Sequence, residues 1–426
     1  MEGSLNIPKG VTLCGEWAQP DGKSPVEGTI FKIYNGKGDR GGRPFMTLSN
    51  NCMVRNVNFW YPEQTLESGD PIAYPPTILS GSYCHVRNVT FVNSYIAVQQ
   101  GPTMSGCPNV YNAYGTPLAV GFDIDGIADI GRYDTINLAP DYWIHSGLAG
   151  APSSNEDAEK LKEYLSTQAI GFILRRIDWS FLTFYNVTGY GTGLSFSLSE
   201  CTEEFNQENG RRYSYPNGNC YGLNFKDCGV AIYVEGVSSS GEVLANVNID
   251  NCMTGISVAY DDHCRDGNIQ FADMTIDATD YAIDHEGWLK VSVLSSTIEN
   301  GLVYTTCGAI SMINCDFETE APHATLESGT HNAIFTGNRF KGDPVIENKG
   351  LCPSAIDHTP IEVDEIKRLT EEQTRTREAK AAKNTLYVLE VDSTGKTDVT
   401  AAIQAELDKA GAAGGGIVFL LSLIHI

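Results

Sequence analysis

A repeat of about 22 residues runs through the middle of the chain and limits the folds that the chain can adopt. The repeats begin at residues spaced 24, 22, 22, 19 and 23 positions apart: Leu223, Val247, Ile269, Val291, Ile310 and Ala333. The position two residues later is apolar in every repeat and the residue between is mostly polar, which predicts a strand with one buried face. Four residues after each start stands Asp, Asn, Ser or Gly, so we expect every strand to end in the same turn.

Cysteines recur one position after this expected turn, at Cys228, Cys252 and Cys315. Neighbouring strands of a sheet lie about 4.8 Å apart, so a single register would stack these thiols as an interior ladder of small apolar side chains. The chain has twelve cysteines but no C-x-x-C pair, which argues against a zinc site and against a compact disulfide scaffold.

A second, longer repeat lies toward the amino terminus. "CMVRNVNF" from Cys52 and "CHVRNVTF" from Cys84 are 32 residues apart, as expected for a rung that is enlarged by a loop. Leucine-rich repeats have a similar period, but they need a leucine lattice that this chain lacks. We therefore expect an all-β chain in which short strands and polar turns stack into a right-handed parallel β-helix over residues 1–358.

The charge balance and the hydropathy disfavour two classes of partner. The chain has 29 basic and 53 acidic side chains and a formal net charge of −24. This charge repels the phosphates of nucleic acids and anionic membrane surfaces. No stretch approaches the roughly 18 uninterrupted apolar residues of a membrane span. We expect neither a nucleic acid nor a membrane as partner, and the sequence gives no oligomeric state.

The segment "DVTAAIQAELDKAGAAGGGIVFL" near the carboxyl end predicts a different unit. Val399 and Ile403 recur at helical spacing behind a capping Asp398, and Gly411 stands where a left-handed helix cap is expected. Residues 417–420 are short and apolar and predict a buried strand. The expected unit is therefore a helix, a tight turn and a strand.

These features together resemble the pectin lyase-like superfamily. The resemblance rests on the strand-rich rungs, on "TDVTAAIQAELDKAG" followed by "GGGIVFL", and on two stretches that are similar to bacterial polygalacturonase-related and pectate-lyase-related proteins, "NAYGTPLAVGFDIDGIADIGRYDTINLAPDYW" and "RRIDWSFL". In that superfamily such a helix caps the amino-terminal end of the β-helix. The resemblance implies a carbohydrate-active protein, secreted or at the cell surface, with a polysaccharide or oligosaccharide as its substrate.

The resemblance also implies a domain organisation. The opening "MEGSLNIPKGVTLCGE" is similar to the segment that follows the cap, so residues 1–358 are expected to be a β-helix without its amino-terminal cap. The charged segment 359–385 predicts a linker or a solvated helix. Residues 386–420 are expected to be the truncated start of a second β-helix and 421–426 a non-native tail, which would make the chain a fragment of a tandem protein.

Two carboxylates stand on one predicted strand, within "PLAVGFDIDG". Phe122 and Ile124 alternate with Asp123 and Asp125, so both carboxylates are expected on the outward face, about 6.5–7 Å apart. This separation suits the two carboxyl groups of an inverting glycosidase. The alternative is a solvated strand face, or turn carboxylates held by Arg132 and backbone amides.

Asp178 is the strongest single candidate for a catalytic carboxylate. In "RRIDWS" it lies between Arg176 and the indole of Trp179, a setting that can tune its pKa and stack a sugar ring. The alternative is a structural Arg–Asp pair. Another carboxylate lies beside two aromatic residues in a loop, where the group either binds a sugar or fills the loop core: Asp141, Tyr142 and Trp143.

Glycan hydrolysis by a pair of carboxylates, without metal or cofactor, is the favoured function. The expected acid–base pair is Asp178 with Asp123, Asp125 or Asp141, and the expected sugar contacts are Tyr142, Trp143, Trp179, Arg132 and Arg176. Three glutamates that follow the strand "GLSFSLS" are kept as reserve candidates, with a charged loop as the alternative: Glu200, Glu203 and Glu204. The polygalacturonase pattern is not met, because Asn248-Ile249-Asp250 and Asp261-Asp262 are only 11 residues apart and neither G-H-G nor R-I-K occurs.

Two other functions stay open. A polyuronate lyase would need Ca²⁺ and an arginine base, for which Arg132, Arg175 or Arg176 could serve, although the charge of −24 disfavours a polyanionic substrate. A non-catalytic, glycan-binding or adhesin-like β-helix would show the same repeats, because a repeat scaffold is stable with or without a reactive groove.

Overall fold

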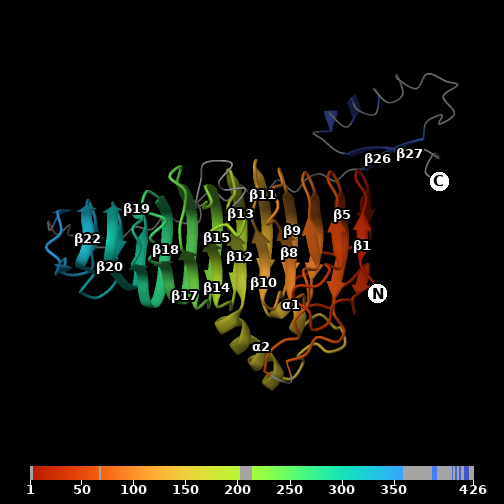
Figure 1. The fold of residues 1–426 in the computed structure, drawn as a ribbon, viewed down its shortest axis with the longest axis horizontal. Coiled ribbons are helices and arrows are strands. Elements are labelled where there is room, and N and C mark those ends of the chain that lie inside the picture. Colours follow the sequence, from red (N-terminus) through yellow and green to blue (C-terminus); the bar gives the residue numbers. More distant parts are fainter. Residues whose placement is uncertain are drawn as a thin grey trace. The chain divides into compact units, whose positions relative to one another are not determined.

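The computed structural model describes residues 3–66, 69–201, 214–357, 386–390, 405, 408–409, 412–413 and 417–421. The chain divides into two units, Met1–Glu362 and Val363–Ile426, which are described separately. The first unit is a parallel β-helix whose strands stack along one axis (Figure 1). The expected all-β solenoid is therefore confirmed.

Each turn of the solenoid contributes strands to three faces, which we call A, B and C, and the registered strand pairs are parallel. Face A contains β1 (Leu5–Ile7), β4 (Met46–Leu48), β6 (Ile78–Ser80), β8 (Ile96–Gln100), β10 (Val120–Ile124), β12 (Ile170–Leu174), β14 (Thr192–Phe196), β16 (Val230–Val234) and β24 (Ile346–Asn348). Face B contains β2 (Thr12–Cys14), β19 (Lys290–Leu294) and β25 (Ser354–Ile356), and face C contains β3 (Ile30–Lys32), β21 (Asp316–Phe317) and β23 (Arg339–Phe340).

The remaining strands pass through more than one face. Those that cross from face B to face C are β5 (Met53–Trp60), β7 (His85–Phe91), β9 (Asn109–Gly115), β11 (Gly131–Leu138), β13 (Ser180–Thr188) and β15 (Gly218–Lys226). The longer strands that also include a stretch of face A are β17 (Glu242–Val258), β18 (Asn268–His285), β20 (Thr297–Ile313) and β22 (Ala324–Thr336).

The corner between faces B and C is a single residue in the left-handed conformation. Asn56, Asn88 and Asn112 have φ of 59°, 52° and 63°, and the later rungs use Asp273 and Asn314 at this corner. Asn and Asp tolerate this conformation because their short side chains bond locally. The side-chain amide of Asn88 donates to Asn56 and that of Asn112 donates to Asn88, both at 2.9 Å, so the corner is also a ladder of hydrogen bonds.

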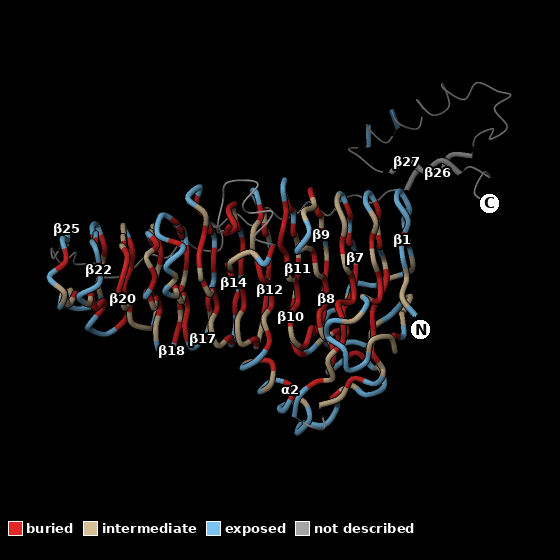
Figure 2. The backbone as a smooth tube through the Cα atoms, in the orientation of Figure 1, coloured by how far each residue is buried: buried red, intermediate tan, exposed pale blue. Residues whose placement is uncertain are grey.

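Aromatic stacks fill the interior of the solenoid. Phe59 and Phe91 lie 5.2 Å apart with nearly parallel rings, and Phe122 and Phe172 repeat this stacking at 5.1 Å. All four side chains are fully buried. Figure 2 shows buried residues along the strands and exposed residues mostly at the turns and in the insertions. Side chains that point inward from neighbouring rungs therefore form one continuous core.

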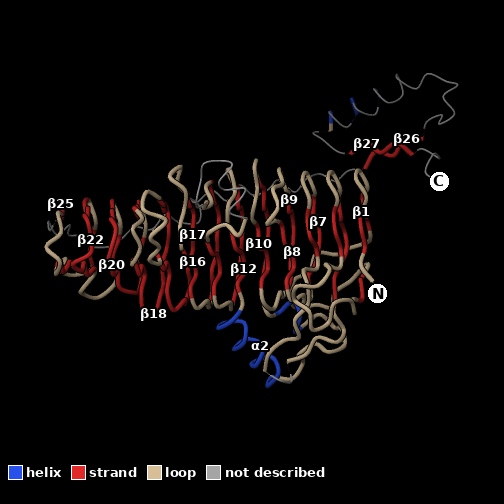
Figure 3. Tube along the Cα trace, viewed as in Figure 1, coloured by secondary structure: helices blue, strands red, loops and turns tan. Residues whose placement is uncertain are grey.

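Two insertions interrupt the regular rungs at the corner between faces C and A. Residues 61–77 separate β5 from β6, and residues 139–169 separate β11 from β12 and contain α1 (Asp141–Ile144) and α2 (Asn155–Gln168). The same corner takes four residues between β9 and β10 and three between β15 and β16. Both helices lie on one side of the solenoid (Figure 3). Insertions of this length are often functional.

The predicted register is correct in two blocks and wrong between them. Leu223 pairs with Val247, and Ile269 begins a second correct series with Val291. However, Val247 pairs with Met274, and Ile269 pairs with Glu242. The first block belongs to face C and the second to face B. A polar residue in the left-handed conformation ends the face C stretches of the first block and also the face B stretches of the second block. The sequence pattern therefore did not distinguish the corner after face C from the corner after face B.

This slip also divides the expected cysteine ladder. Cys228 and Cys252 lie on adjacent rungs, and the backbone N–H of Cys228 donates to the Cys252 sulfur at 3.4 Å. Cys315 belongs to a different column, where its N–H bonds Asn338. All three thiols are buried. The 32-residue repeat is correct, because β5 and β7 pair from Met53 with His85 onward.

The second unit contains one parallel strand pair, β26 (Leu386–Glu390) with β27 (Ile417–Leu421). The strand expected over residues 417–420 is part of β27. The described residues do not include the segment 359–385, most of the helix expected from Asp398 to Gly411, or residues 422–426. Within the described part of the chain, the search for a helix with the length and apolarity of a membrane span finds none.

Candidate functional site

The outward side of face A becomes polar where its strands end and the chain turns toward face B. Phe122, Phe172, Leu194 and Ile232 are in register across β10, β12, β14 and β16 and face the core. The next position along these strands is Asp123, Ile173, Ser195 and Tyr233. Two residues beyond that row come Asp125, Arg175, Ser197 and Glu235. We call Asp123, Arg175, Ser195, Ser197, Glu200 and Glu235 the corner site.

Arg175 joins two carboxylates in the corner site. Its Nε donates to Asp123 Oδ1 at 2.9 Å and its Nη2 lies 2.8 Å from Glu200 Oε1. Its Nη1 also donates to the carbonyl oxygen of Leu198 at 3.1 Å. Burial opposes the charge of this guanidinium, but Asp123 and Glu200 outweigh that effect and raise the pKa of Arg175. Arg175 is therefore a fixed cation that positions both carboxylates.

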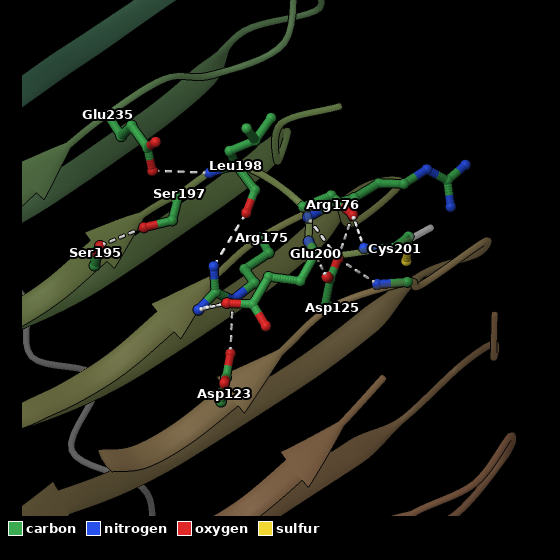
Figure 4. Close-up of polar contacts among 12 residues, drawn as sticks. Asp123, Asp125, Arg175, Arg176, Ser195, Ser197, Leu198, Glu200, Cys201 and Glu235 are labelled. Atoms are coloured by element: carbon green, nitrogen blue, oxygen red, sulfur yellow. Dashed lines mark hydrogen bonds and ion pairs between the residues drawn. The ribbon is translucent and has the colours of Figure 1, made fainter. Parts of the chain in front are cut away.

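Two serines lie between Arg175 and the third carboxylate of the site. Glu235 is half-buried, and its Oε2 accepts the backbone N–H of Leu198 at 3.0 Å. The Ser195 and Ser197 hydroxyls are buried and lie 2.8 Å from each other. Figure 4 shows these serines between Glu235 and Arg175 with its bound Glu200. Arg175 and Glu235 are two rungs apart, which corresponds to about 10 Å between their backbones.

Asp125 is not an exposed outward carboxylate, contrary to the expectation from the strand alternation. It is only 3% exposed, because Arg176, Ser199 and Glu200 pack against its carboxylate. Its carboxylate accepts hydrogen bonds from Gly126 N (2.7 Å), Arg176 N (3.2 Å), Ser199 Oγ (2.8 Å) and Glu200 N (2.7 Å). A buried carboxylate with four donors is well satisfied, so Asp125 fixes the segment that presents Glu200.

Asp178 and Trp179 lie at the same corner, on the side toward face B. Asp178 is exposed, and none of the described residues is a hydrogen-bond partner of its carboxylate. Trp179 is 43% exposed and has a φ of 69°, and its backbone N–H donates to Asn217 Oδ1 at 2.9 Å. The Arg176 guanidinium contacts Met104 Sδ at 3.0 Å, two rungs away. Trp179 is thus available as a sugar platform, whereas the expected Arg176–Asp178 contact is not among these interactions.

Asp141, Tyr142 and Trp143 lie at the opposite corner, between faces C and A. Asp141 begins α1 and its carboxylate is 3.9 Å from the His145 ring. β12 separates this corner from Asp178, which corresponds to more than about 13 Å along the strand. The expected pairing of Asp141 with Asp178 is therefore not formed.

The two aromatic residues beside Asp141 are not open platforms. Trp143 is only 1% exposed, so the expected stacking of a sugar on its face is wrong. The Tyr142 ring is half-buried against Tyr114, with 5.7 Å between ring centroids, and burial raises the pKa of its hydroxyl. Both side chains fill the insertion, which was the alternative interpretation of this loop.

Arg132 belongs to an exposed strip on face B. Its guanidinium lies 6.0 Å from the Phe181 ring centroid, and Arg87 lies 4.9 Å from that of Tyr111. The outward positions of this face are in register across β5, β7, β9, β11, β13 and β15. We call them the face B strip: Arg55, His85, Arg87, Tyr111, Arg132, Phe181 and Tyr221. A hollow of about 210 Å³ lies between Tyr111, Arg132 and Phe181.

The residues that partly resembled the polygalacturonase motif make contacts within the fold. Asp250 pairs with Lys226 at 2.7 Å, and Asn248 lies in register with Asn224. Asp261 accepts hydrogen bonds from the Tyr215 hydroxyl and, at 2.8 Å, from the His263 ring. Burial opposes ionisation of Asp261, but these donors outweigh it and lower its pKa.

Sequence reasoning missed Glu235, Ser195 and Ser197, and it kept Glu200 only as a reserve candidate. A signal was present, because the serines alternate with core residues in "GLSFSLSE" and Glu235 follows the apolar strand "VAIYV". Glu203 and Glu204 lie outside the described residues. Within the described residues, no group of three or more His, Cys, Asp or Glu side chains could hold a metal ion.

No protein-family model, curated protein or solved structure matches this chain.

Proposed function

We propose that this β-helix is a glycoside hydrolase that acts at the corner site, with Glu235 and Glu200 as its paired carboxylates. The observation that carries the proposal is the chain of contacts between these two groups: Glu200 is held by Arg175, the Arg175 guanidinium donates to the Leu198 carbonyl, and the Leu198 N–H donates to Glu235. The backbones of Arg175 and Glu235 are two rungs apart, or about 10 Å. Inverting enzymes hold their two carboxyl groups about 6.5–9.5 Å apart, which leaves room for a water.

The surroundings of the two carboxylates suit different roles. The cation of Arg175 fixes the carboxylate of Glu200, as a general base that activates water requires. Glu235 lies across the two serines from Arg175 and is not an ion-pair partner of that cation, so it takes the role of the acid that protonates the leaving oxygen in this scheme. Water would add across the glycosidic bond, with its hydroxyl on the anomeric carbon and a proton on the released oxygen. Asp123 and Asp125 are positioning residues in this scheme.

The resemblance to the pectin lyase-like superfamily forms part of this proposal, because the β-helix alone does not identify a reaction. The lyase alternative is less well supported at the corner site. A lyase base must release its proton, whereas Asp123 and Glu200 hold Arg175 in its charged form and raise its pKa.

The face B strip favours a second candidate, a non-catalytic glycan-binding β-helix. Exposed aromatic and guanidinium groups bind sugar rings and carboxylates, and the strip presents three arginines although the whole chain is acidic. A uronate-containing glycan would match this local charge.

A digestion assay with two glutamine variants separates these functions. The purified chain would be incubated with a panel of neutral and uronate polysaccharides, and reducing ends and ultraviolet-absorbing unsaturated products would be measured with and without a chelator. A hydrolase releases reducing ends without that absorbance. Glu235→Gln and Glu200→Gln should each lower the rate by about 100-fold or more.

Glu347→Gln is the matched control, because Glu347 is also an outward face A carboxylate but lies on the distant strand β24. Its rate should stay unchanged. Glycan binding without released ends would favour the binding module, and a chelator-sensitive unsaturated product would favour the lyase. Full activity in Glu235→Gln would rule out the assignment of the corner site.

A further inference from the structure

An aromatic cluster lies one rung beyond Glu235, at the same corner between faces A and B. Val234 is in register with Val258, and the N–H of Ala259 donates to the Val234 carbonyl oxygen at 2.9 Å. Ala259 is therefore the neighbour of Glu235 on the adjacent rung, about 5 Å away between backbones, and Tyr260 is the next residue. We call three residues of this corner the aromatic corner: Tyr260, Trp288 and His331.

Tyr260 is the open ring of the aromatic corner. The Trp288 ring centroid lies 5.9 Å from that of Tyr260 and 4.9 Å from that of His331. The Arg265 guanidinium also lies over the Trp288 ring, 5.0 Å from its centroid. Trp288 is packed on several sides and half-buried, whereas Tyr260 is 54% exposed. An exposed ring that is supported by a second ring is a platform for the apolar face of a sugar.

The loop that carries Tyr260 is fixed by side-chain contacts. The Tyr260 hydroxyl donates to Asp262 Oδ1 at 2.7 Å, which orients the ring. The Cys264 thiol donates to the Val237 carbonyl oxygen at 3.2 Å, and this bond ties the loop to the segment that follows Glu235. A platform that is already in position loses little conformational freedom when a ligand binds.

The charges of this loop indicate which kind of sugar fits. Residues 259–267 contain three aspartates against one arginine and one histidine. Arg265 is paired with Asp262 at 3.2 Å, and the His263 ring is paired with Asp261 at 2.8 Å. Both basic groups are thus compensated, and the loop keeps an excess of negative charge. This charge would repel a uronate, whereas an uncharged sugar meets no such penalty.

The order of the two glutamates along the solenoid gives the direction of the substrate. Arg175, which holds Glu200, lies on β12, and Glu235 follows β16, two rungs closer to Tyr260. In inverting hydrolysis the base activates a water on one face of the sugar, and the acid protonates the leaving oxygen on the opposite side. The sugar that leaves therefore lies on the Glu235 side, toward Tyr260.

We propose that Tyr260 binds the leaving-side sugar of an uncharged glycan, so that the reducing end of the glycan points from Glu235 toward β18. Tyr260 has this role only if the corner site performs the hydrolysis proposed above. Glu200 then takes a proton from water, and the hydroxyl bonds to the anomeric carbon as the glycosidic bond breaks. The released oxygen, which belongs to the sugar over Tyr260, takes the proton of Glu235.

Kinetics with and without a leaving-side sugar test this proposal. Cellohexaose, xylohexaose, mannohexaose and hexagalacturonate would be incubated with the full chain, and reducing ends would be measured. For each neutral hexaose that is cleaved, the second substrate is the fluoride of the matching disaccharide in the same anomeric configuration. Its leaving group is fluoride, so no sugar lies over Tyr260. We expect cleavage of at least one neutral hexaose, and slower cleavage of hexagalacturonate.

Variants then separate stacking from other roles of the side chain. Tyr260→Ala should raise the KM for the neutral hexaose about fivefold with little change in kcat, because a binding contact is lost before and during the reaction. It should cleave the fluoride as the parent does. Tyr260→Phe keeps the ring and should keep a KM close to that of the parent. Tyr83→Ala is the matched control, because Tyr83 is 50% exposed and lies between β6 and β7; both substrates should be unaffected.

The possible failures are distinguishable. With Glu235→Gln inactive, an unchanged KM for the hexaose in Tyr260→Ala would overturn the role of Tyr260 alone. An equal loss on the hexaose and the fluoride would also overturn it, because the ring would then act on the other side of the bond. Preferred cleavage of hexagalacturonate would overturn the uncharged substrate. If the parent cleaves none of the hexaoses, or if Glu235→Gln keeps full activity, hydrolysis at the corner site and the role of Tyr260 both fail.

Discussion

The rungs from β5 to β16 and those from β17 to β25 share one scaffold but differ in what they carry. The earlier rungs contain the two long insertions, the corner site and the face B strip. The later rungs run almost continuously through their corners in strands of 13 to 18 residues. They also bury ionisable side chains, among them Glu242 and His285.

This difference follows from the way a solenoid is held together. Each rung packs only on its neighbours, so one group of rungs can vary its corners while another supplies continuous pairing. We therefore expect substitutions in the earlier rungs to change ligand binding and activity, and substitutions at the buried ionisable groups of the later rungs to change stability and its dependence on pH.

Replacing Glu242 should have the largest effect on stability. Burial raises the pKa of Glu242 to about 8, from 4.5. The unfolded chain releases this proton above about pH 4.5 and the folded chain keeps it up to about pH 8, so the free energy of unfolding falls across that window by on the order of 5 kcal/mol. Glu242→Gln should remove this loss, as measured by urea unfolding at pH 4.5 and pH 9. An unchanged pH dependence would contradict the burial of a neutral carboxyl group.

His285 should act in the opposite direction. Burial lowers its pKa to about 4, from 6.5. As the pH falls from 6.5 to 4 the unfolded chain binds a proton that the folded chain refuses, which costs about 3 kcal/mol of stability. His285→Gln should flatten this acidic limb in the same urea experiments. His263→Gln replaces an exposed histidine and is the control. An equal flattening in His263→Gln would show that the loss of stability at acidic pH does not come from His285.

Asp125→Asn should reduce both stability and activity. The new amide would place an NH₂ group against N–H donors that now bond a carboxylate, at a cost of about 2 kcal/mol. Glu200 would lose its backbone anchor, so hydrolysis should slow about tenfold. Asp178→Asn is the matched control and should stay within about 0.5 kcal/mol of the parent, because Asp178 is exposed. Equal stability of the two variants would show that Asp125 does not organise this corner.

Arg132→Ala should have the smallest effect and tests the face B strip. The loss of one exposed cation–π contact and one charge corresponds to about 0.5–1 kcal/mol, or a twofold to fivefold weaker affinity for uronate oligosaccharides. Affinity electrophoresis in gels that contain polygalacturonate would measure this loss of affinity, with Arg265→Ala on a later rung as control. An identical retardation of the two variants would exclude the strip as a glycan surface.

The repeat predicted the fold because one buried face per strand and one polar residue per corner are requirements of each rung separately. It did not predict the register from Val247 to Ile269. Asn251 and Asp273 are both polar and left-handed, although they end stretches on different faces. The strand register is set by which residues pair between rungs, and local patterns do not contain that information.

The candidate site was less predictable than the fold. The alternation that placed Asp123 outward did not predict that Ser199 and Glu200, from a later rung, cover the Asp125 carboxylate. Glu235 and Glu200 come together only through Arg175 and Leu198, which belong to different rungs. Trp143 was expected to be a platform because it stands with Asp141 and Tyr142 in a loop, but it is only 1% exposed, and it lines one hollow together with residues 62–66 of the other insertion.

The most direct test compares Glu235→Gln and Glu242→Gln, two like substitutions on adjacent strands, for both hydrolysis rate and unfolding free energy at pH 7. The account predicts that Glu235→Gln loses about 100-fold or more in rate and keeps its stability, whereas Glu242→Gln keeps its rate and changes in stability. If the rate and the stability change together in both variants, or if Glu235→Gln stays fully active, the proposed separation of function and stability between the two groups of rungs is wrong.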